Sequence, residues 1–265
     1  MVETQQELTR DVFLGGALTI WQPRIGYRAA TDPVFLAAAV TARPGDHVLE
    51  LGCGVGVALL ALGRRVPGLT LAGVERQDQY AALARRNAAE NDLSARIETA
   101  DIAALPASLK RGFDHVLINP PYYPPTAPAA ANAARAAALR EETPLGDWVD
   151  VALKRLKPGG HLTVIHLAER LPALLAALDG RAGAVVVKPL CARAGRAAGR
   201  VIVRARKGAL GPFRLLAPLI LHDGSHHARD GNDFSAAAQA LLRDGRAMIW
   251  DDPRTGAIST KIPKS

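Results

Sequence analysis

The chain has 265 residues, of which 49% are hydrophobic and 22% are charged, and it carries a formal net charge of +8. This composition excludes disordered and fibrous proteins and is typical of a single α/β domain with additions around one large core. The excess of positive charge favours polyanionic partners, although charge alone identifies no nucleic acid.

Strand-like and helix-like segments alternate along most of the chain. Short apolar runs bounded by glycine or proline indicate buried strands, and apolar residues at helical spacing indicate helices. Such alternation predicts a mostly parallel sheet. The predicted elements are, in chain order, strand 47–52, helix 55–66, strand 69–75, helix 78–91, strand 95–100, a short helix near 103–109, strand 113–119, helix 146–156, strand 161–167, helix 169–179, and strands 184–188 and 200–206. Residues 212–222 and 245–250 are predicted to add a small hairpin.

The first strand runs into a glycine turn, with glycines at positions 52, 54 and 56. Glycine lets the backbone turn sharply and approach a ligand closely, and the following helix supplies free N–H groups at its N-terminus. The next strand ends at Glu75, nineteen positions after Gly56. An acid at this spacing in a Rossmann-like sheet binds ribose hydroxyls. The pattern therefore predicts a cofactor that contains a nucleoside.

The acids in this region distinguish S-adenosylmethionine from a dinucleotide. The turn has the pattern GxGxG and follows Glu50, whereas the dinucleotide fingerprint is GxGxxG. A carboxylate at this place repels a pyrophosphate but suits a cationic sulfonium ligand with an ammonium group. Asp101 ends the third strand, where it can accept a hydrogen bond from an adenine amine. Each acid alone also fits a solvated strand end, but their succession favours S-adenosylmethionine.

The fourth strand, 113–119, stops at the tetrad Asn119-Pro-Pro-Tyr122. Two consecutive prolines remove two backbone donors, so the strand ends and leaves acceptors exposed. The Asn119 amide oxygen and the Pro120 carbonyl can accept both hydrogens of a planar amine, while Tyr122 offers a stacking face. The alternative is a proline-rich turn that closes an ordinary strand.

These motifs resemble, in order and spacing, the class I S-adenosylmethionine-dependent methyltransferases, and the tetrad resembles their N-methylating branch. Within that branch the chain is most similar to the bacterial tRNA adenine N6-methyltransferase family, which modifies the anticodon-loop adenine of a valine tRNA. The resemblance is strong over about residues 45–170, and residues 223–234 depart from it in being richer in His and Asp. Weaker points of similarity are residues 26–33, Tyr123, residues 138–141 and residues 218–222.

The resemblance implies a Rossmann-like fold with a seven-stranded, mostly parallel sheet, helices on both faces and the last strand inserted antiparallel. It also implies three parts: an N-terminal segment that caps the cofactor site, 1–45, the methyltransferase domain, 46–208, and a C-terminal extension packed on the same domain, 209–265. The expected reaction is direct methyl transfer from S-adenosylmethionine to adenine N6 in RNA, with tRNA as the expected partner and no metal.

The site residues predicted on these grounds fall into three groups. Asp32 is included because the resemblance places an acid near the methionine end of the cofactor, although it also fits a helix N-cap before Pro33. The catalytic group is Asn119, Pro120, Pro121 and Tyr122; the cofactor-binding group is Asp32, Glu50, Gly52, Cys53, Gly54, Gly56, Glu75, Arg76, Asp101, Ile102 and Asn119; the substrate-binding group is Tyr123, Arg204, Arg206 and Lys207.

Three further segments have two interpretations each. Nine cations and no acid lie between residues 180 and 222, which fits either a polyanion-binding surface or a solvated face. The Pro/Ala-rich segment 124–138 fits either a lid over the target nucleotide or a passive linker. The His and Asp residues of 222–233 are of the types that bind metals. A loop of solvated polar residues is favoured instead, because no regular element fixes their spacing.

The cysteines and the N-terminus bear on the cellular compartment. Cys53 and Cys191 are far apart in sequence and have no CxxC or Cys/His spacing, so neither a disulfide framework nor a zinc site is indicated. The polar N-terminus lacks the features of a signal peptide, and no apolar window reaches bilayer length. We therefore expect a cytoplasmic protein without a membrane segment, present as a monomer or homodimer.

Three rival functions remain. Enzymes that methylate a glutamine amide in release factors use the same tetrad, but they resemble chains with a longer helical domain ahead of the glycine turn. A DNA adenine methyltransferase usually carries a separate target-recognition region. A noncatalytic RNA-binding or assembly factor that retains the fold is the third, and the complete set of acids and the complete tetrad disfavour it.

Overall fold

The computed structural model describes residues 7–121, 143–224 and 233–250. Its central sheet contains the predicted seven strands in the order β8-β9-β7-β6-β3-β4-β5. Strand β9 lies antiparallel between β7 and β8, and the other neighbouring strands of this core run parallel. The predicted seven-stranded core, with its inserted antiparallel strand, is therefore confirmed, and two further short strands extend the sheet to nine strands within the described residues. The strands are β3 His47–Leu51, β4 Thr70–Glu75, β5 Ala95–Thr99, β6 Phe113–Ile118, β7 Leu156–Leu167, β8 Ala182–Cys191 and β9 Ala198–Lys207.

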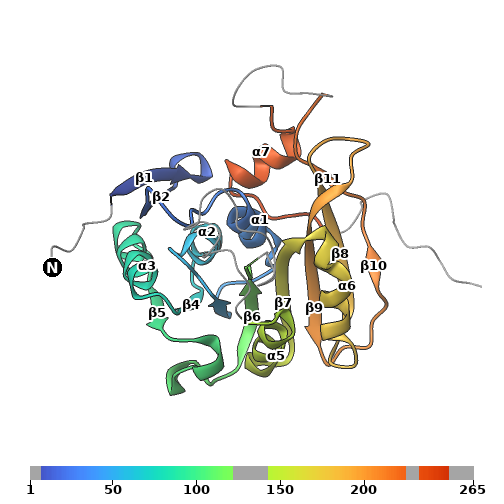
Figure 1. Ribbon diagram of the computed structural model, residues 1–265, viewed down its shortest axis with the longest axis horizontal. Helices are drawn as coiled ribbons and strands as arrows, with labels where there is room; N and C mark the ends of the chain where they lie inside the picture. The colour runs from blue at the N-terminus through green and yellow to red at the C-terminus, as the bar shows by residue number, and fades with distance from the viewer. Residues whose placement is uncertain (1–6, 122–142, 225–232, 251–265) are drawn as a thin grey trace, which may run out of the picture.

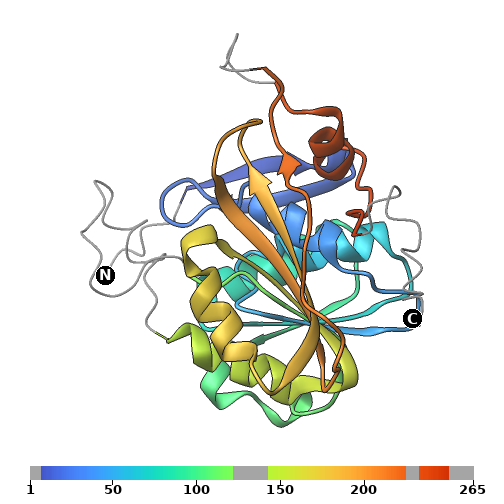
Figure 2. The ribbon, with the colours of Figure 1, turned by 90° about the vertical axis from the view of Figure 1, so that its right-hand side faces the viewer.

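Helices cover both faces of this sheet (Figures 1 and 2). Alternate residues of each strand point to opposite faces, so Val48 and Leu117 join one apolar cluster while Leu49 and Val116 join the other. The first cluster includes α1 Asp32–Ala39, α2 Val57–Arg65, α3 Asp78–Glu90 and α7 Ala236–Leu242, and the second includes α5 Leu145–Arg155, α6 Leu171–Leu178 and the 3-10 turns η2 Ile102–Ala104 and η3 Ala107–Leu109. One further 3-10 turn, η4 Ala168–Arg170, precedes α6.

The N-terminal segment forms a hairpin that the sequence did not predict, with β1 Leu8–Phe13 paired antiparallel to β2 Leu18–Pro23 across the turn η1 Leu14–Gly16. It is held along α3 by two buried amides, since Asn87 Oδ1 accepts from the Trp21 N–H at 2.8 Å and Asn91 Oδ1 accepts from the Thr19 N–H at 2.9 Å. The chain then reaches the start of α3, where the Tyr27 N–H donates to Tyr80 Oη at 3.1 Å.

Two predicted boundaries are wrong for local reasons. The strand predicted to begin at residue 161 already begins at Leu156, because Leu156 pairs with Phe113 across an irregularity in the register. The predicted helix 103–109 is instead the two turns η2 and η3, which Pro106 separates.

The predicted hairpin of residues 212–222 and 245–250 is also wrong. The short strands β10 Arg214–Leu215 and β11 Leu219–Ile220 both pair parallel with β8, whose outer backbone groups offer them hydrogen bonds. Residues near 250 attach to α1 instead, because the Met248 N–H donates to the Ala38 carbonyl at 2.7 Å and Trp250 Nε1 donates to the Ala39 carbonyl at 2.9 Å. Helix α7 was not predicted. The division into segments 1–45, 46–208 and 209–265 remains a prediction.

Candidate functional site

The carboxyl ends of β3, β4 and β6 and the segment after β5 surround one pocket. It encloses about 1080 Å³, including the space open to solvent, which is enough for a nucleoside-sized ligand. Ligands of open α/β sheets bind at this edge, because the parallel strands deliver their following loops there. The pocket is lined by residues from every motif that the sequence analysis placed at a strand end.

The glycine turn forms one wall and requires glycine for two reasons. Gly52, Gly54 and Gly56 all have positive φ, at 69°, 53° and 90°. A Cβ on Gly52 would also lie 2.7 Å from Cη2 of Trp148, so even alanine would force the indole away. The turn therefore brings its backbone close to the pocket, while the N–H groups of Gly52 and Cys53 donate to the Val74 carbonyl.

Three carboxylates line the pocket in different hydrogen-bonding environments. Glu50 is 3% exposed and accepts from the Leu59 N–H at 2.9 Å. Glu75 accepts from the Gly54 N–H at 3.0 Å and from the Gln77 N–H at 2.9 Å, which ties the second strand end to the glycine turn. Asp101 is exposed and caps η2 by accepting from the Ala103 N–H at 2.8 Å. This set suits a ligand with an ammonium, ribose hydroxyls and an adenine amine.

Burial raises the pKa of Glu50 from its ordinary 4.5 to about 8, with Glu75 adding to the rise and the Leu59 N–H opposing it. Because the folded pKa lies above the unfolded one, the stability that protonation contributes is fully present below about pH 4.5 and is lost as pH rises through about 8. Glu50→Gln is therefore expected to raise the free energy of unfolding by a few kcal/mol near pH 8 and to change it little at acid pH, since one pKa unit corresponds to about 1.4 kcal/mol.

Thermal unfolding of both proteins across that pH range checks this. The same variant is expected to bind S-adenosylmethionine more weakly, because the ionised Glu50 is the form that attracts an ammonium. A variant whose stability follows the same pH curve as the parent would show that the pKa of Glu50 is the same in the folded and unfolded protein.

The segment after β6 places the predicted acceptors at the pocket. Ile118 is the last strand residue and is fully buried, and Asn119, Pro120 and Pro121 line the cavity directly after it. Gly52, on the neighbouring strand end, lies on the same cavity. Tyr122, Tyr123 and the segment 124–138 lie outside the described residues, so their roles remain predictions.

Three aromatic side chains of the pocket were missed by the sequence analysis. Tyr27 and Tyr80 meet edge-on with their ring centroids 6.4 Å apart, and both line the cavity. Burial, together with Asp32, Glu50 and Glu75, raises the pKa of the Tyr27 hydroxyl, so it remains a neutral donor. Trp148 also lines the cavity, and its buried Nε1 has no hydrogen-bond partner among the described residues. Tyr27 lies within residues 26–33, but no local pattern marks Trp148.

The predicted cofactor-binding residues reach the pocket with two exceptions. Glu50, Gly52, Cys53, Gly54, Glu75, Arg76, Asp101, Ile102 and Asn119 all line it. Gly56 instead begins α2 and packs near Ala84. Asp32 does not line the cavity but pairs with Arg200, with Oδ2 3.0 Å from Nε, and lies close enough to Tyr27 to affect its pKa.

The three cations of the predicted substrate-binding group, Arg204, Arg206 and Lys207, do not line the pocket. Because β9 runs antiparallel, its last residues lie at the opposite edge of the sheet, where Arg206 pairs with His161 near the start of β7. Arg206 Nε donates to the Gly159 carbonyl at 2.9 Å and Lys207 Nζ donates to the Leu156 carbonyl at 2.8 Å. The Arg204 guanidinium stacks on Trp250, 4.4 Å from the ring centroid. Any contact with substrate through these residues is therefore remote from the pocket.

The described ends of the His/Asp segment, residues 222–224 and 233, make specific side-chain contacts. His222 Nδ1 lies 2.7 Å from Asp233 Oδ1, and the buried Arg193 donates to Asp233 as well. This fixes the turn between β8 and β9 to the C-terminal segment. Within the described ranges, no group of three or more His, Cys, Asp or Glu side chains has the arrangement of a metal site. No helix in the same ranges is long and apolar enough to cross a bilayer.

Comparisons with known proteins identify the family of this chain. The family described as "Methyltransferase small domain" matches residues 31–178. A tRNA1(Val) (adenine(37)-N6)-methyltransferase from Dickeya chrysanthemi is 30% identical over 230 residues, which cover 83% of this chain and 88% of the relative. A protein of the same name from Porphyromonas gingivalis is 33% identical over 174 residues, covering 62% of this chain and 68% of that one.

Solved structures show the same fold. A protein from Agrobacterium tumefaciens described as a predicted O-methyltransferase superposes with a TM-score of 0.66 at 26% identity, covering 82% of this chain and 98% of the other. The 16S rRNA N2 G1207 methyltransferase of T. Thermophilus, solved with AdoMet and guanosine, gives a TM-score of 0.54 at 21% identity, covering 78% and 52%. The chain therefore belongs to the methyltransferase small domain family and is a class I methyltransferase whose cofactor is S-adenosylmethionine.

Proposed function

We propose that this enzyme methylates the exocyclic N6 of an adenine in tRNA, and that the adenine lies in the anticodon loop. The observation that carries the proposal is the placement of Asn119 and Pro120 on the cofactor pocket, beside the glycine turn. The names of its relatives, tRNA1(Val) (adenine(37)-N6)-methyltransferases, support tRNA and adenine N6 as the substrate. A tRNA substrate also supports the predicted cytoplasmic location. The predicted monomer or homodimer remains a prediction.

The chemical problem is the weak nucleophilicity of an aromatic amine. The N6 lone pair is delocalised into the adenine ring, so the amine must be held in a geometry that localises it. The Asn119 amide oxygen and the Pro120 carbonyl accept the two N6 hydrogens and direct the lone pair towards the cofactor. Pro120 and Pro121 leave no backbone N–H to compete for these acceptors.

The remaining residues position S-adenosylmethionine and the target adenine relative to each other. S-adenosylmethionine supplies an electrophilic methyl group on a positively charged sulfur. Glu50 attracts its ammonium, Glu75 accepts from the ribose hydroxyls and Asp101 accepts from the adenine amine. Tyr122 and Tyr123 would stack on a target base that has left its own stack. One proton leaves N6 after the methyl group has been transferred, so no strong general base is required.

The deciding experiment incubates the protein with labelled S-adenosylmethionine and separate pools of tRNA, rRNA, DNA and release factor. We expect label in tRNA, released by digestion as N6-methyladenosine and identified by mass spectrometry. Label in a release-factor glutamine, in DNA adenine or in no macromolecule would each refute the proposed substrate. A tRNA whose anticodon-loop adenine is replaced by guanine is the matched control and should accept no methyl group.

A further inference from the structure

Four cations from three strands share one face of the sheet. Arg214 of β10 is the Cα partner of Val186 in β8, and Val186 is the partner of Arg204 in β9, so the two arginines point to the same side. Lys188 lies two residues after Val186 in β8, and Arg206 lies two residues after Arg204 in β9. Both therefore point to that same side. We call Lys188, Arg204, Arg206 and Arg214 the basic face.

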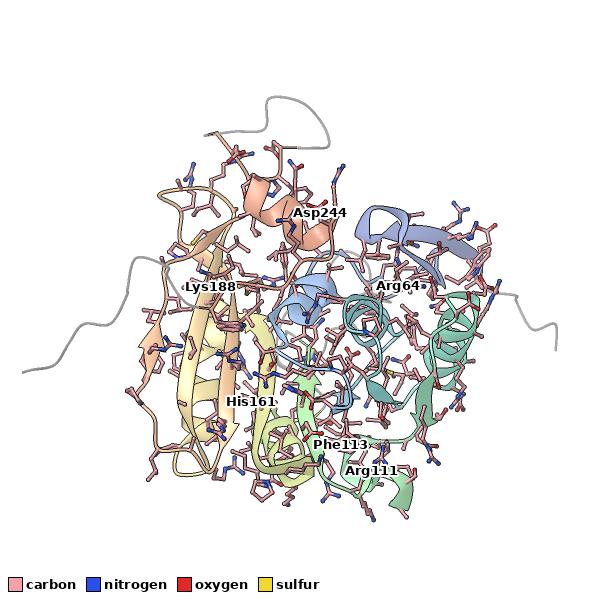
Figure 3. The ribbon with its side chains drawn as sticks, turned by 180° about the vertical axis from the view of Figure 1, so that it is seen from behind. Arg64, Arg111, Phe113, His161, Lys188 and Asp244 are labelled. Atoms are coloured by element: carbon pink, nitrogen blue, oxygen red, sulfur yellow. The ribbon has the colours of Figure 1, made fainter. Side chains whose placement is uncertain are left out.

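The four cations of the basic face differ in exposure and in the groups that orient them. Arg206 is exposed and is oriented by the Gly159 carbonyl, 2.9 Å from its Nε. Arg204 is half-buried over Trp250, whose own indole is anchored by the Ala39 carbonyl. Arg214 is exposed and Lys188 is partly exposed. Figure 3 labels Lys188 on the β8 side of the molecule and Arg111 at the opposite lower side, with His161 between them.

The strands that carry these cations hold no acid, although Asp46, just before β3, acts electrostatically on His161 beside them. No acid occurs between residues 180 and 222 of the sequence, so strands β8, β9 and β10 contribute none. His161, the Cα partner of Arg206, has its pKa lowered to about 4 by burial, by His115 and by Arg204 and Arg206. The imidazole therefore stays neutral. A surface with this charge attracts polyanions.

We propose that the basic face binds the sugar-phosphate backbone of the tRNA at a distance from the nucleotide that enters the pocket. This inference rests on the proposed function and extends it to the partner surface. Phosphate contacts position a nucleic acid while a separate site reads the base. The same side of β9 continues to Arg200, which pairs with Asp32 near the pocket. Between Arg204 and Arg200 this side of β9 is covered at Ile202, which is fully buried, so a backbone on the basic face and a nucleotide in the pocket would occupy separate surfaces of the protein.

The test is the double charge reversal Lys188→Glu/Arg214→Glu, which leaves the stacked Arg204 in place. The matched control is Lys110→Glu/Arg111→Glu, which changes the net charge equally on the exposed loop between η3 and β6. We expect the Kd for full-length tRNA to rise at least about tenfold in the test variant. The slope of log K for tRNA binding against log salt concentration should also become shallower by about two units. The control is expected to change both by much less.

Methylation of a short anticodon stem-loop should remain near the parent rate, because that substrate is held mainly by the pocket. Equal losses in test and control variants, or an unchanged salt slope, would overturn the basic face as the docking surface. Binding of polyglutamate that exceeds binding of tRNA would assign the face to an acidic protein instead. These results are separable from the proposed function: failure of the parent to methylate tRNA refutes the reaction, whereas unchanged tRNA binding by the test variant refutes only the surface.

Discussion

Replacing Asn119 by alanine is expected to lower kcat for methyl transfer by about 10²- to 10³-fold, the usual cost of removing one preorganised polar group from a reacting centre. The affinity for S-adenosylmethionine should change little, because Glu50, Glu75 and the glycine turn remain on the pocket. The loss arises because one hydrogen of the amine no longer has an acceptor, so its lone pair is not directed at the methyl group. Single-turnover kinetics with saturating cofactor measure this effect directly.

Asn119→Asp is the matched control, since it keeps an acceptor oxygen at the same position while removing the amide. It should retain more activity than Asn119→Ala if acceptance of the N6 hydrogen is the role of this side chain. Thermal unfolding of both variants shows whether the fold is intact. Retention of most activity by Asn119→Ala, with an intact fold, would remove Asn119 from the catalytic group.

Replacing Glu75 by alanine is expected to weaken S-adenosylmethionine binding by about 10²-fold, because hydrogen bonds to a charged group contribute roughly 1.5–3 kcal/mol each. The Glu75 carboxylate also accepts from the Gly54 and Gln77 N–H groups, so the change loosens the glycine turn as well as removing the ribose contact. Isothermal titration calorimetry of the parent and of Glu75→Ala gives the two dissociation constants.

S-adenosylhomocysteine provides the discriminating comparison, because it has the same ribose but lacks the positive sulfur. A ribose-binding Glu75 predicts equal losses of affinity for both ligands. A loss confined to S-adenosylmethionine would show that Glu75 acts on the sulfonium charge instead. Glu75→Gln, which keeps one acceptor oxygen, should fall between the parent and the alanine variant.

Local sequence was sufficient for the cofactor half of the site. Gly52, Glu50 and Glu75 are near one another in sequence or follow successive strands, and the parallel sheet brings successive strand ends to one edge. The same rule placed Asp101 and Asn119. Residues whose position depends on a long connection were not found, since Trp148 reaches Gly52 only through the packing of α5 against the sheet.

The arrangement of the cations in β9 could not be predicted from the sequence. Charge and spacing grouped Arg204, Arg206 and Lys207 as one run, but alternation along β9 sends Arg206 and Lys207 to opposite faces. The antiparallel insertion of β9 also carries their end of the strand away from the pocket. A run of like charge in sequence is therefore divided in space by the geometry of the strand that contains it.

The sequence by itself determined the sheet, the glycine turn, the strand-end acids and the acceptor tetrad, because hydrophobic period and backbone chemistry are local properties. Only the tertiary structure decided which aromatic side chains enclose the pocket, how Asp32 is paired and which cations share a surface. These features depend on contacts between Asp32 and Arg200, or between Arg204 and Trp250, whose distance along the chain leaves no periodic signal.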